Sequence, residues 1–116
     1  MLEDLGDVVT TVVDALVAAG IPATGDQRDL NPPGVYVTPP VVTWDKVGDC
    51  YTATLDLYAV VPAAGRLEAL AALGPLVGSV RAVWPAREAF PVDLQPLEGT
   101  DPLPAYRLPL TVHVGD

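Results

Sequence analysis

The chain has 116 residues, half of them apolar, with 13 prolines and a formal net charge of −9 at pH 7. This length suits a single domain over residues 1–116, and the apolar content is too high for a disordered chain. The negative charge argues against binding to nucleic acid, which needs a positive surface, and against docking on anionic lipid.

Signals of export or membrane insertion are missing from the sequence. The one cysteine, Cys50, cannot form a disulfide within the chain, and we expect it to be a packing residue. Residues 1–9, MLEDLGDVV, lack the basic region of a signal peptide. No apolar run reaches the ~18 residues of a membrane span. We therefore expect no membrane partner and a protein that stays in the cytosol of the cell that makes it.

The first predicted element is a helix over residues 3–19. Acidic residues near its start favour the positive end of a helix dipole, and Gly20 with Pro22 provides a stop signal. The many β-branched residues leave a strand as the competing assignment. Spacings of three and four give one apolar stripe, which consists of Leu5, Val8, Val9, Val12, Val13, Leu16 and Val17.

Short strands are predicted next. Residues 23–33 are a loop or an irregular strand, residues 34–38 a strand, and residues 41–44 a further strand. A turn over residues 45–49 leads to the clearest strand, 50–61, so that 41–44 and 50–61 are expected to form a hairpin. The second face of strand 50–61 ends apolar, so we expect its C-terminal half to be covered. Its other face is expected in the core and carries Tyr51, Ala53, Leu55, Leu57, Ala59 and Val61.

A second helix is predicted over residues 63–84. Gly74–Pro75 is expected to kink or split it, because proline removes a backbone hydrogen bond. Its predicted core stripe consists of Leu67, Leu70, Leu73, Val77, Val80 and Trp84.

Two strands end the predicted order, one over residues 92–95 and one over residues 106–114. The last alternates cleanly, and Pro109 predicts an edge strand or an edge-facing position within it. Its expected inward residues are Tyr106, Leu108, Leu110, Val112 and Val114. The order α–β–β–β–α–β–β predicts an α+β fold, a mainly antiparallel sheet with two helices packed on one face.

The sequence offers no recognisable catalytic or ligand-binding constellation. His113 is the only histidine and is expected on the outward face of the last strand, while Ser79, the only serine, lies mid-helix. Asp26, Asp29 and Asn31 have the wrong spacing for a calcium loop. No glycine-rich phosphate-binding motif occurs. We therefore expect no enzymatic activity, no metal and no cofactor.

Aromatic and arginine side chains on loops and strand faces suggest a different role. Tyr, Trp and Arg are enriched in protein interfaces. In the alternative interpretation, Trp44 and Trp84 cap the edges of the core. In the interface interpretation, a sheet edge and the outward patch Tyr58/Val60 dock on a neighbour. The candidate subunit or tube interface consists of Arg28, Asp29, Tyr36, Trp44, Tyr58 and Arg107.

Four segments together resemble a known family. They are LVAAGIPAT (residues 16–24), DQRDLNPPGVYVTPP (26–40), LDLYAVVP (55–62) and DPLPAYRLPLTV (101–112). In this order the chain is similar, over nearly its whole length, to the tail terminator or minor tail proteins of actinobacterial siphophages. The similarity lies in the order and the general residue pattern of these segments, and RDLNPPGVYV and PLPAYRL are its most specific parts.

The resemblance implies a structural virion protein that assembles in the host cytoplasm. Such proteins form a homo-hexameric ring on the head-proximal end of the tail tube, where they stop addition of the major tail tube protein. The ring presents a surface to the neck or head-completion protein, and DNA passes through its lumen without specific binding. The family has no catalytic residues. Six copies would carry 6 × −9 = −54 formal charges, and a negative lumen would repel phosphate.

Assembly is expected to depend on the tail. A ring needs head-to-tail contacts between two different patches. We expect weak self-association in solution and ring closure templated by the tail end. Two alternatives remain open, a head–tail connector or neck protein, and a small α+β ligand-binding or enzymatic domain. A deep polar pocket with a perturbed titratable pair would favour the latter.

Overall fold

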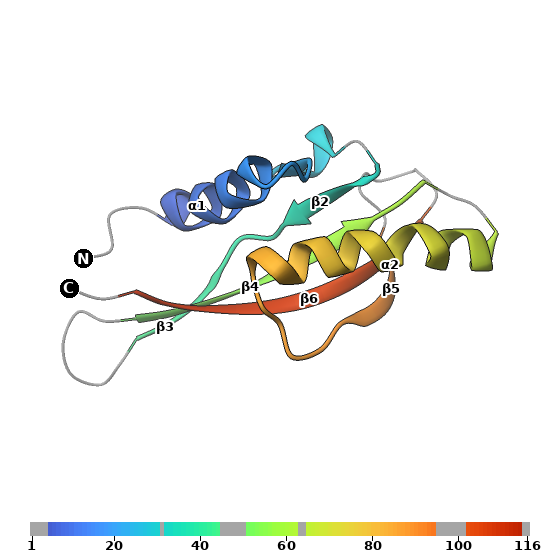
Figure 1. Ribbon diagram of the computed structural model, residues 1–116. Coiled ribbons are helices and arrows are strands. Elements are labelled where there is room, and N and C mark those ends of the chain that lie inside the picture. Colours follow the sequence, from blue (N-terminus) through green and yellow to red (C-terminus); the bar gives the residue numbers. More distant parts are fainter. Residues whose placement is uncertain (1–4, 31, 45–50, 63–64, 95–101, 115–116) are drawn as a thin grey trace.

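The fold is two helices on one face of a six-stranded sheet (Figure 1). The structure is a computed structural model that describes residues 5–30, 32–44, 51–62, 65–94 and 102–114. The α+β class and the predicted order of helices and strands are confirmed. The elements are α1 (Leu5–Ala18), β1 (Ala23–Thr24), the 3-10 helix η1 (Gln27–Asp29), β2 (Gly34–Val37), β3 (Val41–Trp44), β4 (Tyr51–Val60), α2 (Arg66–Val83), β5 (Phe90–Leu94) and β6 (Leu103–Val114).

The strands run in the order β1-β2-β4-β6-β5, and β3 also pairs with β4. All pairs are antiparallel except β1–β2, so the sheet is mixed and mainly antiparallel. The predicted hairpin pairing is confirmed by the register Trp44↔Tyr51 between β3 and β4. Residues 45–50, which include the predicted turn and Cys50, lie outside the described residues.

The ladder between β4 and β6 forms the centre of the sheet. It runs over ten pairs, from Val60↔Ala105 to Tyr51↔Val114. Strand β5 pairs only with residues 103–107 of β6, so the remainder of β6 is an edge on that side. Pro109 lies in this remainder, which confirms the predicted edge-facing position for a residue that has no N–H to donate.

The main core lies between the sheet and the two helices. All six predicted inward residues of the long strand are at most 2% exposed. Val12 and Leu16 from α1 and Leu73 and Val80 from α2 pack in the same region. Burial of this one continuous apolar layer is the main force that holds the helices on the sheet.

Helix α1 ends as its stop signal predicts. Gly20 has φ +86°, a conformation that residues with a side chain rarely adopt. The Gly20 N–H donates to the Val17 carbonyl and the Ile21 N–H to the Leu16 carbonyl, at 2.9 and 3.0 Å. This pair of bonds closes the helix C-terminus and turns the chain towards the sheet.

Helix α2 departs from the prediction in two ways. It runs without a break through Pro75, so of the predicted kink or split the split is wrong. Its predicted stripe is also wrong at the N-terminal end, where Leu67 is 79% and Leu70 is 43% exposed. The small Ala69 is buried instead. At about 100° per residue, Leu67 lies nearly opposite Ala69 on the helix, so both cannot face the sheet.

Candidate interaction surface

The face of the sheet opposite the helices carries a line of large side chains from four strands. The registers Tyr36↔Tyr58, Tyr58↔Arg107 and Phe90↔Arg107 place one residue each on β2, β4, β6 and β5. Residues at paired positions share a face of the sheet. We call Tyr36, Tyr58, Arg107 and Phe90 the cross-strand row, and the face that carries it the open face.

The two tyrosines of the row form a stacked pair. Their ring centroids are 6.2 Å apart and the ring planes differ by 19°. Tyr36 is buried and Tyr58 is half-buried. Burial raises the pKa of the Tyr36 hydroxyl above its ordinary value, and the Asp26 carboxylate and Tyr58 raise this pKa further. This end of the row is therefore packed, with the Tyr36 ring largely removed from solvent.

Arg107 lies beside Phe90 towards the other end of the row, and its Nε has no acceptor among the described residues. Its Cζ atom lies 5.0 Å from the centroid of the Phe90 ring, a cation–π contact. Its Nε atom is buried and has no hydrogen-bond partner, and no ion pair joins it to a described residue. A buried donor without an acceptor costs about 1–3 kcal/mol. The open face thus holds a guanidinium whose hydrogen-bonding capacity is partly unused.

Part of the open face beside the row is buried. Val60 is 0% and Ala105 is 2% exposed, and neither belongs to the core cluster beneath the helices. These two residues are paired on β4 and β6. The expectation that the C-terminal half of the second face of β4 is covered is therefore confirmed.

Arg28 belongs to a local loop motif rather than to the row. Its backbone N–H donates to Asp26 Oδ1 at 2.9 Å, and its Nη2 lies 3.3 Å from Asp26 Oδ2. The backbone hydrogen bond, followed by the side-chain one, lowers the pKa of Asp26. The Arg28 side chain is 79% exposed. Because both partners lie within three residues of each other, this pair organises η1.

Asp29 and Trp44 are also separate from the row. Asp29 borders a small hollow together with Val17 of α1. Trp44 is 63% exposed and pairs with Tyr51, seven residues along β4 from Tyr58, or about 23 Å at 3.3 Å per residue. The structure therefore unites three of the six predicted interface residues, Tyr36, Tyr58 and Arg107.

The predicted core-capping role fits one tryptophan only. Trp84 packs against the core, and its Nε1–H donates to the carbonyl oxygen of Val12 at 3.3 Å, which joins α2 to α1. Trp44, in contrast, is largely exposed and does not pack against the core. The two tryptophans thus have different roles, structural for Trp84 and surface for Trp44.

Phe90 was missed by the sequence analysis. The strand was expected to begin at residue 92, after Pro91, whereas β5 begins at Phe90. Because β5 is an edge strand, Pro91 is tolerated within it. Phe90 is the only phenylalanine in the chain, and an earlier start of the strand would have placed it opposite Arg107.

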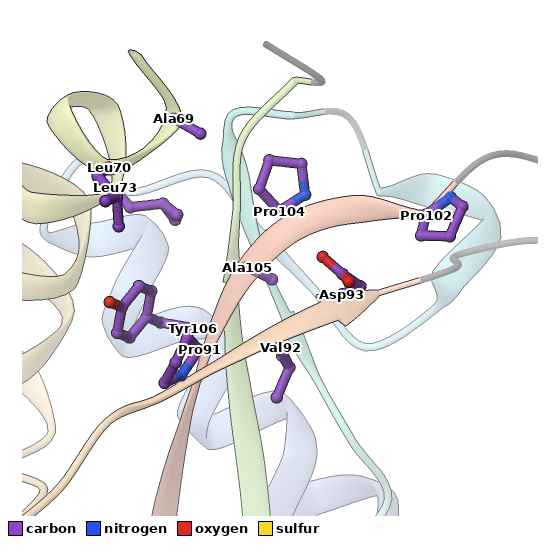
Figure 2. Close-up of a pocket in the computed structure, with 10 residues that line it drawn as sticks. All are labelled: Ala69, Leu70, Leu73, Pro91, Val92, Asp93, Pro102, Pro104, Ala105 and Tyr106. Carbon is purple, nitrogen blue, oxygen red and sulfur yellow. The ribbon is translucent and has the colours of Figure 1, made fainter. Parts of the chain in front are cut away.

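A groove lies between α2 and the paired parts of β5 and β6 (Figure 2). It has a volume of about 860 Å³, and Figure 2 shows Leu70 and Leu73 of α2 on one side and the strand residues on the other. Asp93 is its only charged residue among the described lining, and this side chain is exposed. We call it the α2 groove, and its lining residues are Ala69, Leu70, Leu73, Pro91, Val92, Asp93, Pro102, Pro104, Ala105 and Tyr106.

Within the described residues, no three His, Cys, Asp or Glu side chains are grouped so that they could hold a metal ion. Ser79 is exposed on α2, and His113 lies on β6 opposite Thr52, with its side chain outside the described part. Neither described helix is long and apolar enough to cross a membrane. In comparisons with known proteins, no family model, no curated protein and no solved structure matches the chain.

Proposed function

We propose that this chain is a structural subunit of a phage tail, a tail terminator whose copies form a ring on the head-proximal end of the tail tube. The ring would stop addition of the major tail tube protein and offer the neck or head-completion protein a surface to join. The site of action would be the virion, after assembly in the host cytoplasm.

The cross-strand row is the observation that carries a binding role. It combines two stacked tyrosines, a phenylalanine that is exposed on the edge strand β5, and an arginine whose Nε lacks a described acceptor. Aromatic and arginine side chains dominate the energetics of protein interfaces. A surface of this composition on the face opposite the helices, with Phe90 exposed at its rim, supports a protein partner, and the chain-wide resemblance described above supports a phage tail as its setting.

The negative charge of the chain is compatible with DNA passing through such a ring without binding to it. Each copy carries −9, and nucleic acid binds where positive charge replaces its counterions. Among the described arginines, Arg28 is paired with Asp26, and Arg81 donates to the carbonyl oxygen of Ala86 at 3.0 Å. A ring of such subunits would let DNA slide through its lumen without retaining it.

Deletion of the gene from a phage that carries it tests this function. Negative-stain electron microscopy of the lysate should show filled heads beside unattached tails of abnormal and variable length. Wild-type protein supplied from a plasmid should restore normal tails, whereas a plasmid with an early stop codon should not. Tails of normal length that fail to join heads would assign the chain to the connector instead, and normal infectious particles would exclude both functions.

The templating step has its own measurement. Purified protein should be monomeric at micromolar concentration and should form rings only when tails from the deletion lysate are added. Size-exclusion chromatography with light scattering measures the first state, and electron microscopy of the tail ends measures the second. A stable ring at nanomolar concentration without tails would contradict templated closure.

A further inference from the structure

Strands β5 and β6 contribute to two different patches, the cross-strand row on the open face and the α2 groove beside α2, whose lining also includes Val92 and Ala105. Phe90 and Arg107 belong to the open face, while Asp93 and Tyr106, which border the α2 groove, belong to the helix face. Successive residues of a strand alternate between faces. One copy can therefore offer its row to one neighbour and its groove to another, which is the head-to-tail arrangement that a cyclic assembly needs.

The two patches have complementary charge. Arg107 is the only cation of the cross-strand row, with Asp56 on the same face two residues along β4 from Tyr58, whereas the described lining of the α2 groove holds Asp93 and no cation. Asp93 makes no hydrogen bond or ion pair with a described residue. Two copies at −9 each repel one another at long range. A contact between them is therefore favoured where a cation of one copy meets a carboxylate of the other.

The two patches also match in size and polarity. Phe90 is 37% exposed at the rim of the open face, and Leu70 is 43% exposed at the groove. The groove volume of about 860 Å³ lies within the range of about 300–1,000 Å³ of sites that enclose small ligands, so a benzyl side chain can enter it. Docking would remove both apolar side chains from water.

We propose that the cross-strand row of one copy docks on the α2 groove of a second copy of this chain, with Phe90 entering the groove and Arg107 meeting Asp93. This contact specifies how neighbouring subunits of the proposed ring would meet. It rests on the proposed function only in requiring that two copies of the chain associate. Asp93 of the second copy would supply the guanidinium with a carboxylate, which no described residue of the same chain supplies through an ion pair. Strand β5 takes part on both sides of the contact, since it carries Phe90 and Asp93.

Charge exchange tests the pairing of Arg107 with Asp93. Sedimentation equilibrium over a concentration series into the millimolar range measures self-association of the full chain. R107D and D93R should each weaken association about tenfold or more, because each places like charges together. The double variant R107D/D93R should recover most of the wild-type affinity. Circular dichroism confirms that each variant is folded.

A matched control separates this pairing from net charge. Arg87 is exposed and lies outside both patches, so R87D changes the net charge as R107D does and should leave association within about twofold of wild type. Failure of the double variant to recover, or equal weakening by R87D, would overturn the pairing. A wild-type chain that stays monomeric throughout the series would overturn the contact itself.

A photoreactive side chain at position 90 tests the location of the contact without any change of charge. Phe90→p-benzoylphenylalanine is mixed with isotope-labelled wild-type chain, irradiated and mapped by mass spectrometry. Cross-links between unlabelled position 90 and labelled residues 69–73 or 102–106 are expected. Cross-links confined to other segments, or none at all, would overturn the assignment.

Phage complementation distinguishes the failure of this contact from the failure of the proposed function. If deletion yields tails of variable length while R107D and D93R both restore normal tails, the terminator function stands and the contact is wrong. If the cross-link forms but deletion leaves tails normal, the contact stands and the function is wrong. Rescue by R107D/D93R, with no rescue by either single variant, supports both.

Discussion

The two faces of the sheet are built from the same strands but differ in how completely their side chains are packed. The helix face buries a continuous apolar layer that includes Leu55 and Leu57, both at most 2% exposed. The open face alternates with it along β4 and carries the half-buried Tyr58. On the first face the buried apolar side chains form one core cluster, whereas on the second Arg107 keeps a buried Nε without a described acceptor. Under the proposed function, residues that stabilise the fold and residues that contact a partner are thus separated by a single step along each strand.

The largest expected effect is on the helix face. Leu57→Ala should lower the free energy of unfolding by about 2–5 kcal/mol, because it leaves a cavity beneath the helices. Tyr58→Ala, one residue further on the open face, should cost about 1–2 kcal/mol, since its ring is only half-buried and loses one stacked partner. Urea denaturation of both variants measures the contrast. Equal losses would show that the open face is also core, and Leu57→Met serves as a volume-conserving control.

The contact between the helices should give the next effect. Trp84→Phe removes the hydrogen bond from Nε1 to the Val12 carbonyl oxygen but keeps an aromatic ring against the core. We expect a loss of about 0.5–1.5 kcal/mol in thermal or urea unfolding. Trp44→Phe, on an exposed edge of the sheet, is the matched control and should change stability by less than about 0.5 kcal/mol.

Replacement of Arg107 should change the free energy of unfolding much less than replacement of a core residue. Arg107→Met keeps an unbranched side chain over Phe90 and removes the donor that lacks an acceptor. The cation–π contact is lost, at about 0.5–1 kcal/mol, while the desolvation cost of the donor is relieved. We therefore expect the stability of the single chain to stay within about 1 kcal/mol of wild type. A loss of several kcal/mol in urea denaturation would assign Arg107 to stability instead of recognition.

The smallest expected effect concerns pH and the buried end of the row. Because the pKa of Tyr36 is raised in the folded protein, the folded state holds this proton more tightly than the unfolded state. The resulting stabilisation is complete below the ordinary tyrosine pKa near 10 and is lost as pH rises through the folded value. Tyr36→Phe should make unfolding less sensitive to pH in the alkaline range. Tyrosine absorbance during a pH titration measures the ionisation directly, and an unchanged alkaline profile in this variant would contradict the shift.

The parts of the fold that depend on local sequence patterns were predictable. The alternation over residues 50–61 identified the inward face of β4 correctly, and Gly20 marked the end of α1. The orientation of α2 could not be predicted from its leucines, because the sheet packs against Ala69 and leaves Leu67 exposed. Side-chain volume alone gave the wrong stripe.

The candidate surface was predictable in composition and not in geometry. Tyr, Trp and Arg were singled out by residue type, yet which of them meet depends on strand register. Register joined Tyr36 to Tyr58 and Tyr58 to Arg107, and it left Trp44 at the far end of β4. The entry of Phe90 into β5 depends on an edge position that accepts Pro91, and only the assembled sheet reveals that edge.

The central ladder also has a consequence for how the chain reaches its fold. Its closest pair in sequence, Val60↔Ala105, is 45 residues apart, and its most distant, Tyr51↔Val114, is 63 apart. Chains dominated by such distant pairings pay loop-closure entropy before gaining contacts, and they fold in milliseconds to seconds rather than microseconds. Until β6 arrives, one whole side of β4 has an unsatisfied backbone. Strand β6, the last of the described strands, is thus the one that protects β4, the first long strand, from aggregation during folding.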